Sequence, residues 1–208
     1  IGADVGTIMT INKLNYQEIG KVVGFLNDNF SIEPGLQLIR GASQSNAPLG
    51  TRSVADPLEK DILITSGIIP ELRSILYEIY LEKSIRNPFK IVEFARKFTY
   101  IQSHLDILES GKRLFNCLAG KSVGVIYQNG DVSLCEFYQP IGNLKKVNFN
   151  LSFLWNNSEA EKQRNFIKKC FCNHDCFINT EYNRRFAKSL IVNLNKFAAA
   201  ALKDFKFY

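Results

Sequence analysis

Residues 122–137 of the chain read SVGVIYQNGDVSLCEF. Val123 and Val125 alternate with small or polar residues before Asn129-Gly130, and the alternation continues beyond that pair. An Asn-Gly pair between two alternating runs is the strongest short signal for a β-hairpin with a two-residue turn. The stretch therefore predicts a hairpin over residues 122–137.

The predicted hairpin positions two of the five cysteines in the chain. If the turn holds two residues, Gln128 faces Asp131, and Cys135 then faces Gly124. A glycine opposite a cysteine leaves room above the sheet for a bulky group. Cys117 precedes the first strand and lies at the same end of the hairpin as Cys135. We therefore expect these two thiols to converge.

The other three cysteines lie in the stretch CFCNHDC, residues 170–176. All five cysteines follow residue 116, and no secretory signal is present. An odd number of cysteines without such a signal argues against a disulfide framework. Buried cysteines that act as small apolar residues do not cluster in a polar turn. We therefore expect the thiols to be metal ligands.

Two kinds of metal site are compatible with this pattern, and a third alternative is a set of structural or redox thiols. An iron–sulfur cluster can be surrounded by thiolates from separate segments. Its ligands would be Cys117, Cys135 and two of the three thiols at Cys170, Cys172 and Cys176. A zinc ion would be held locally by Cys170, Cys172, His174 and Cys176. Because zinc ligands are usually paired at spacings of two to four residues, and the zinc site leaves the hairpin thiols without a role, the cluster is favoured.

The N-terminal part of the chain predicts a βαβ unit. Thr7 to Ile11 forms a short apolar strand, and Leu36 to Ile39 forms a second one. Between them, Asn15 and Glu18 have the spacing of a capping box before an amphipathic helix. Strand, helix and strand of these lengths imply that the two strands are parallel.

The middle and the end of the chain predict mainly helices. One helix is expected over Ile69 to Lys83, and another begins with Asn87 as N-cap and Pro88 as the first helical residue and ends at Gly111. A short helix is expected over Ser158 to Lys169, and a closing amphipathic helix from Glu181 onward.

Charge and hydropathy exclude two classes of partner. The net charge of +6 comes from 26 basic and 20 acidic residues that are spread along the chain, so nucleic-acid binding is not expected. No apolar run approaches the roughly 18 residues of a membrane span. We therefore predict a cytoplasmic protein that contacts no membrane.

Several of these segments occur in the order of a known family pattern. Cys117 is followed after twelve residues by Gly130 and after four more by Cys135; Ile-Gly-Asn stands at residues 141–143. Residues 151–155, Arg164 and the cysteine group complete the set. From Asn116 to Cys176 the chain resembles the SPASM/twitch domain of radical S-adenosylmethionine (radical SAM) enzymes.

The resemblance implies an α/β fold with four parts. Residues 1–50 would be the C-terminal portion of a partial (β/α) barrel, and residues 51–115 a helical linker. Residues 116–180 would form a small cluster domain of a β-hairpin and loops, and residues 181–208 a C-terminal helix and tail.

The resemblance also implies a function. The chain would be the C-terminal fragment of a radical SAM oxidoreductase or maturase, in which an auxiliary 4Fe-4S cluster positions or oxidises the substrate. The full-length enzyme would bind S-adenosylmethionine and a second 4Fe-4S cluster. Its expected partners are a peptide or protein substrate and an electron donor such as a flavodoxin or ferredoxin. The alternative from a different class is a zinc-stabilised binding module without catalysis.

Two departures from the family pattern bear on these expectations. A full SPASM domain carries about seven cysteines for two auxiliary clusters, whereas this chain has five, which implies one cluster and one spare thiol. The radical-generating motif Cys-x3-Cys-x2-Cys is absent, because Cys172 and Cys176 are followed by Asn179. We therefore expect that motif upstream and no cleavage of S-adenosylmethionine by this chain alone.

A half barrel that lacks its neighbours would leave apolar side chains uncovered. We therefore expect exposed apolar patches near Ile8, Ile11 and Leu38.

Overall fold

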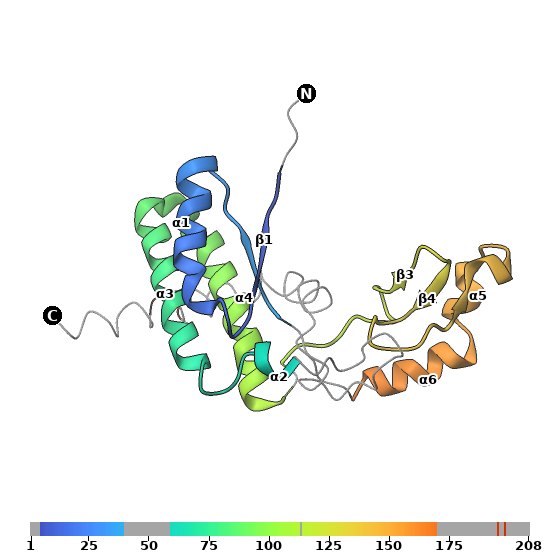
Figure 1. Cartoon of the computed structure of the whole chain (residues 1–208). Coiled ribbons are helices and arrows are strands. Elements are labelled where there is room, and N and C mark those ends of the chain that lie inside the picture. The colour runs from blue at the N-terminus through green and yellow to red at the C-terminus, as the bar shows by residue number, and fades with distance from the viewer. Residues whose placement is uncertain (1–4, 40–58, 113, 170–194, 196–197, 199–208) are drawn as a thin grey trace, which may run out of the picture. The chain divides into compact units, whose positions relative to one another are not determined.

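A computed structural model of the chain describes residues 5–39, 59–112, 114–169, 195 and 198. The chain divides into two compact units. Among the described residues, 5–39 and 59–110 belong to the first unit, and most of 111–169 form the second (Figure 1). In the described part of the chain, no helix is long and apolar enough to cross a membrane.

The first unit begins with the predicted βαβ arrangement. Strand β1 spans Ile8–Ile11, helix α1 spans Ile19–Phe30, and strand β2 spans Gly35–Leu38. The strands are parallel, with Ile8 opposite Gly35 and Ile11 opposite Leu38. The prediction of parallel strands joined by a crossover helix is therefore confirmed.

The predicted exposure of this sheet is only partly correct. Ile8 is 72% exposed, but Ile11 and Leu38 are 0% and 4% exposed. Successive side chains of a strand point to opposite faces, so the face with Ile11 and Leu38 is covered while Ile8 lies on the other. Both buried residues pack in one core with residues of α1 and of the two long helices that follow. The expectation of exposed patches at Ile11 and Leu38 was wrong, because the chain supplies their cover itself.

The capping box predicted at Asn15 does not form. Asn15 precedes a 3-10 turn, η1, at Tyr16–Glu18, and its side chain makes no cap hydrogen bond. Its Oδ1 instead accepts a hydrogen bond from the backbone N–H of Asn12 at 2.8 Å, and its Nδ2 donates to the Thr10 carbonyl at 2.9 Å. The side chain therefore stabilises the loop between β1 and α1.

Two long helices make up most of the rest of the described part of this unit. Helix α3 spans Ile69–Arg86 and helix α4 spans Ile91–Ser110, and α1 and α4 both pack against α3 (Figure 1). A 3-10 turn, η3, at Pro88–Lys90 stands where the first turn of the second helix was expected. Gly111 has a φ of +61°, as predicted for a residue that ends a helix. A short helix, α2, spans Glu59–Ile62.

The second unit is built on a three-stranded antiparallel sheet. Its strands are β3 at Val125–Ile126, β4 at Asp131–Ser133 and β5 at Gly142–Asn143, in the order β3-β4-β5. A 3-10 turn, η4, follows at Leu144–Val147, and then come helices α5 at Leu151–Trp155 and α6 at Ser158–Ile167 (Figure 1). The hairpin and the α6 helix were predicted, whereas β5 was not predicted as a strand.

The hairpin register differs by one residue from the prediction. Val125 pairs with Ser133, and the Tyr127 N–H donates to the Asp131 carbonyl at 2.8 Å. The loop therefore holds three residues and ends at Gly130, whose φ is +93°. Three-residue hairpin loops place their last residue in this left-handed region, which favours glycine.

This shift overturns the predicted role of Gly124. Gly124 does not face Cys135; a Cβ atom at Gly124 would lie 2.7 Å from the Trp155 ring. The space above the glycine is therefore filled by an aromatic side chain of α5. The closing helix predicted from residue 181 onward lies outside the described residues, apart from positions 195 and 198, which are helical.

Candidate metal centre

The two hairpin cysteines lie in the same apolar core. Cys135 follows the end of β4 by two residues and is 5% exposed. Cys117 is half-buried and packs against the core that contains Cys135, Leu134 and Ile167. Both cysteines thus contact one apolar core, and the convergence of their thiols stays a prediction.

A tight turn shapes the chain immediately after Cys117. The backbone N–H groups of Ser122 and Val123 both donate to the Leu118 carbonyl at 3.2 Å, and the Gly120 N–H donates to the Val123 carbonyl at 2.8 Å. The same fold of the backbone lets the Ala119 N–H donate to the Cys117 sulfur at 3.4 Å. Hydrogen bonds of this kind to ligand sulfurs tune iron–sulfur clusters.

Cys117 also lines a cavity of about 150 Å³. Its other lining residues are Asn116, Ala119, Lys121, Arg164, Ile167 and Lys168. Three of these residues are cationic, so they complement the negative charge that thiolates bring to a metal site. The donor chemistry around Cys117 therefore fits a thiolate-ligated group.

The cavity beside Cys117 is also lined by the C-terminal end of α6. Ile167 ends α6, and Lys168 follows it at the cavity wall. Cys170 is two residues further along the chain and lies outside the described residues.

Arg164 connects α6 to the loop that follows Cys117. Its Nε donates to the Gly120 carbonyl at 2.7 Å, its Nη2 donates to the Trp155 carbonyl, and its guanidinium stacks 5.8 Å from the Trp155 ring centroid. Gly120 has a φ of +71°, and a Cβ atom there would lie 2.9 Å from a methyl of Leu134. These contacts fix the position of the Cys117 loop relative to α6.

The Ile-Gly-Asn segment positions the strand that leads to Cys135. A Cβ atom at Gly142 would lie 2.5 Å from a methyl of Leu154, so a larger residue there would require the Leu154 side chain to shift. The Asn143 side chain donates to the Asn129 carbonyl at 3.2 Å and to an Asp131 carboxylate oxygen at 2.9 Å. The segment therefore holds the hairpin loop and α5 together. In the sequence these residues were identified only by their resemblance to the family pattern, and their structural role was not predicted.

The other predicted ligands all belong to residues 170–176. Cys170, Cys172 and Cys176, together with His174, lie outside the described residues. The described residues contain no group of three or more His, Cys, Asp or Glu side chains that could hold a metal ion. The four-thiolate cluster and the local zinc site both stay predictions.

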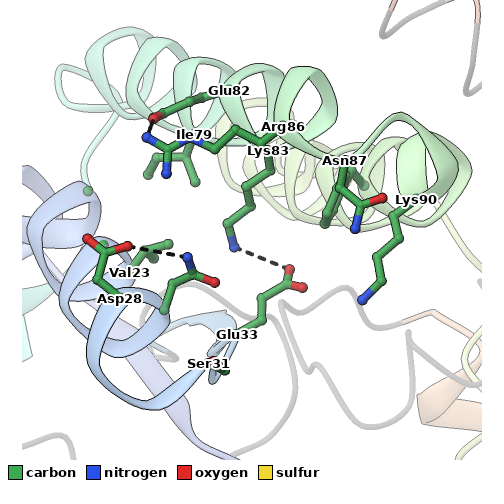
Figure 2. A pocket seen from close by; sticks show the side chains of 14 residues that line it. Val23, Asp28, Ser31, Glu33, Ile79, Glu82, Lys83, Arg86, Asn87 and Lys90 are labelled. Atoms are coloured by element: carbon green, nitrogen blue, oxygen red, sulfur yellow. Dashed lines mark hydrogen bonds and ion pairs between the residues drawn. The ribbon is translucent and has the colours of Figure 1, made fainter.

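A second polar site lies in the first unit and was not found from the sequence. A cavity of about 300 Å³ lies between α1 and the C-terminal end of α3 (Figure 2). Glu33 points toward Lys83 across it, with 3.3 Å between the charged atoms, and also pairs with Lys97 at 3.0 Å. Burial lowers the pKa of Lys83, against the opposing effect of Glu33. Because Glu33 is already shared by two lysines, we read this site as an ion network that joins the βαβ unit to α3 and α4.

Comparisons with protein-family models, with curated proteins and with solved structures found no match for this chain.

Proposed function

We propose that the second unit is an auxiliary iron–sulfur domain that holds one 4Fe-4S cluster. The ligands are Cys117, Cys135 and two of the three thiols at Cys170, Cys172 and Cys176. The observation that carries this proposal is the single core shared by Cys117 and Cys135, beside the end of α6. Two cysteine-bearing segments adjoin this core, and in the sequence the third follows Lys168, which lines the cavity beside Cys117. A cluster can be held by thiolates from several segments.

The wider proposal is that the chain is the C-terminal part of a radical SAM oxidoreductase or maturase. The ordered motif from Asn116 to Cys176 supports it, and the parallel βαβ unit is compatible with a portion of a (β/α) barrel. The radical chemistry of such an enzyme belongs to its cofactors. The part assigned to this chain is to position or oxidise the substrate beside the auxiliary cluster.

The residues around Cys117 have defined tasks in this proposal. The Ala119 N–H donates to the Cys117 sulfur, which stabilises negative charge on that ligand. Lys121, Arg164 and Lys168 line the adjoining cavity and offset the negative charge of the thiolates. Cys135 would bind the cluster from a buried position, which keeps water away from its sulfur.

Metal content tests the proposal directly. The protein reconstituted under anaerobic conditions should hold about four irons per chain and be brown, with broad absorption in the visible range. A colourless protein with about one zinc per chain would support instead the local site at Cys170, Cys172, His174 and Cys176 and would contradict the proposed cluster. A protein that binds neither metal would contradict both.

One thiol of the C-terminal group should be dispensable. A 4Fe-4S cluster takes about four thiolates, and the chain has five cysteines. Among the alanine variants of Cys170, Cys172 and Cys176, at least one should therefore retain the iron content of the unmodified protein. The measurement is iron per chain for each purified variant. Loss of iron in all three would show that the ligand set is not the one proposed.

A further inference from the structure

The outer edge of β3 is the feature from which a second binding function follows. In the described residues, β3 pairs only with β4, so its other edge carries no strand. The Val132 carbonyl accepts a hydrogen bond from the Ile141 N–H of the next strand at 2.7 Å. Val132 therefore directs its backbone groups toward β5, and Ile126, which pairs with it, directs its own N–H and C=O away from β4.

This edge is open to solvent. Ile126 is 57% exposed, and Gly124, which shares its orientation along the strand, is also exposed. In the described residues no strand lies along this edge; the Trp155 ring packs over the face of the sheet at Gly124 and not along its edge. A donor and an acceptor of the main chain are therefore available at Ile126, at the spacing of a β-ladder.

An apolar groove adjoins the same strand. It has a volume of about 480 Å³ and lies between the hairpin and α5. Its apolar lining comes from Val125, Ile126, Val132, Leu151 and Trp155. The groove also contains one cation, Lys121, in the turn before β3.

We propose that this edge and groove bind an extended peptide segment as an added strand. The peptide main chain pairs with Ile126, an apolar side chain of the peptide enters the groove, and an acidic residue lies beside Lys121. Binding by strand addition combines main-chain hydrogen bonds with pockets for alternate side chains, and both elements are present here. A helix satisfies its backbone groups internally, so it would leave the edge unused. This inference does not rest on the iron–sulfur proposal.

The test uses the whole chain, labelled with ¹⁵N, and two synthetic peptides. Both are blocked hexapeptides of alternating valine and threonine, with a glutamate added at the amino end of one and at the carboxyl end of the other. At least one should slow hydrogen exchange of the Ile126 amide tenfold or more. The Tyr127 amide already bonds to Asp131 and should change much less. If neither peptide, at millimolar concentration, affects the Gly124 or Ile126 amide, the proposal is wrong.

Two controls separate strand addition from simple apolar binding. The same peptide with all its backbone amides N-methylated keeps its side chains but cannot donate to the edge, so its affinity should fall at least tenfold. Ile126→Pro should have a similar effect, because proline removes the outward N–H and is tolerated on edge strands. Ile126→Thr keeps that N–H and loses only part of the apolar lining, so its affinity should fall less than that of Ile126→Pro. Equal binding of the N-methylated peptide would overturn the proposal, and that measurement requires no change to the protein.

Discussion

Replacement of Cys117 by alanine is expected to abolish cluster binding, and replacement of Cys135 is expected to do the same. Each thiol is the only cysteine in its segment, so no neighbour can replace it. The expected result is a fall from about four irons per chain to near zero, with loss of the visible absorption. Because the metal would tie together distant segments, the unfolding temperature should also fall.

The two variants differ in whether they remove a proposed ligand alone or a ligand together with core packing. Cys117 is half-buried, whereas Cys135 is 5% exposed and belongs to the apolar core. Cys135→Ala therefore also removes core packing, and Cys117→Ala is the sharper test. The matched control is whichever alanine variant of Cys170, Cys172 or Cys176 retains iron. If Cys117→Ala keeps a full cluster while the protein stays folded, the shared-cluster proposal fails.

The second large effect is expected at Gly142, where alanine should destabilise the second unit. The new Cβ atom would lie 2.5 Å from a methyl of Leu154, which is 3% exposed and cannot move into solvent. The φ of Gly142 is +155°, a conformation that other residues rarely adopt. Overpacking costs about 1–3 kcal/mol and such a backbone conformation a further 1–3 kcal/mol or so. We therefore expect a loss of roughly 2–6 kcal/mol in the free energy of unfolding.

The measurement is denaturant unfolding followed by the fluorescence of Trp155, the one tryptophan of the chain. A useful control is Gly24→Ala in α1, where the new Cβ would have no atom within 4 Å. Alanine in place of glycine inside a helix should stabilise the first unit by about 1 kcal/mol. An unchanged unfolding midpoint for Gly142→Ala would show that Leu154 does not press on this position.

Local patterns predicted the elements of this chain better than their details. The βαβ unit, α3, α4 and the hairpin were expected because their apolar residues repeat at the helix or strand period. The hairpin register was missed because Asn129-Gly130 also fits a three-residue loop. The three-residue loop is stabilised in part by Asn143, which donates hydrogen bonds to it from β5. Asn143 lies 14 residues from Asn129, so a rule that considers only the Asn-Gly pair and its neighbours does not include this contact.

The failures at Ile11 and Leu38 have a similar cause. Their exposure was inferred from the expectation of missing neighbours, but α3 and α4 share one core with the strands. For the candidate site, the pattern of cysteines predicted that the thiols of Cys117 and Cys135 converge; the structure places Cys135 in an apolar core and Cys117 against it, and the ligand set stays a prediction. It did not predict the contact between Arg164 and Gly120, since hydrogen bonds to backbone carbonyls leave no recognisable residue pair in a sequence.

The bond between Arg164 and Gly120 has a consequence for the order in which the second unit assembles. It joins residues 44 positions apart, whereas the pairs of the hairpin close short loops. Closing a longer loop costs more chain entropy, and contacts that are distant in sequence form slowly. During synthesis the hairpin can therefore fold before α6 has left the ribosome. At that stage Cys117 and Cys135 would be the only two ligands of the proposed cluster already synthesised. In the proposed cluster domain, metal insertion would then follow the docking of α6, because the remaining cysteines come after α6 in the sequence.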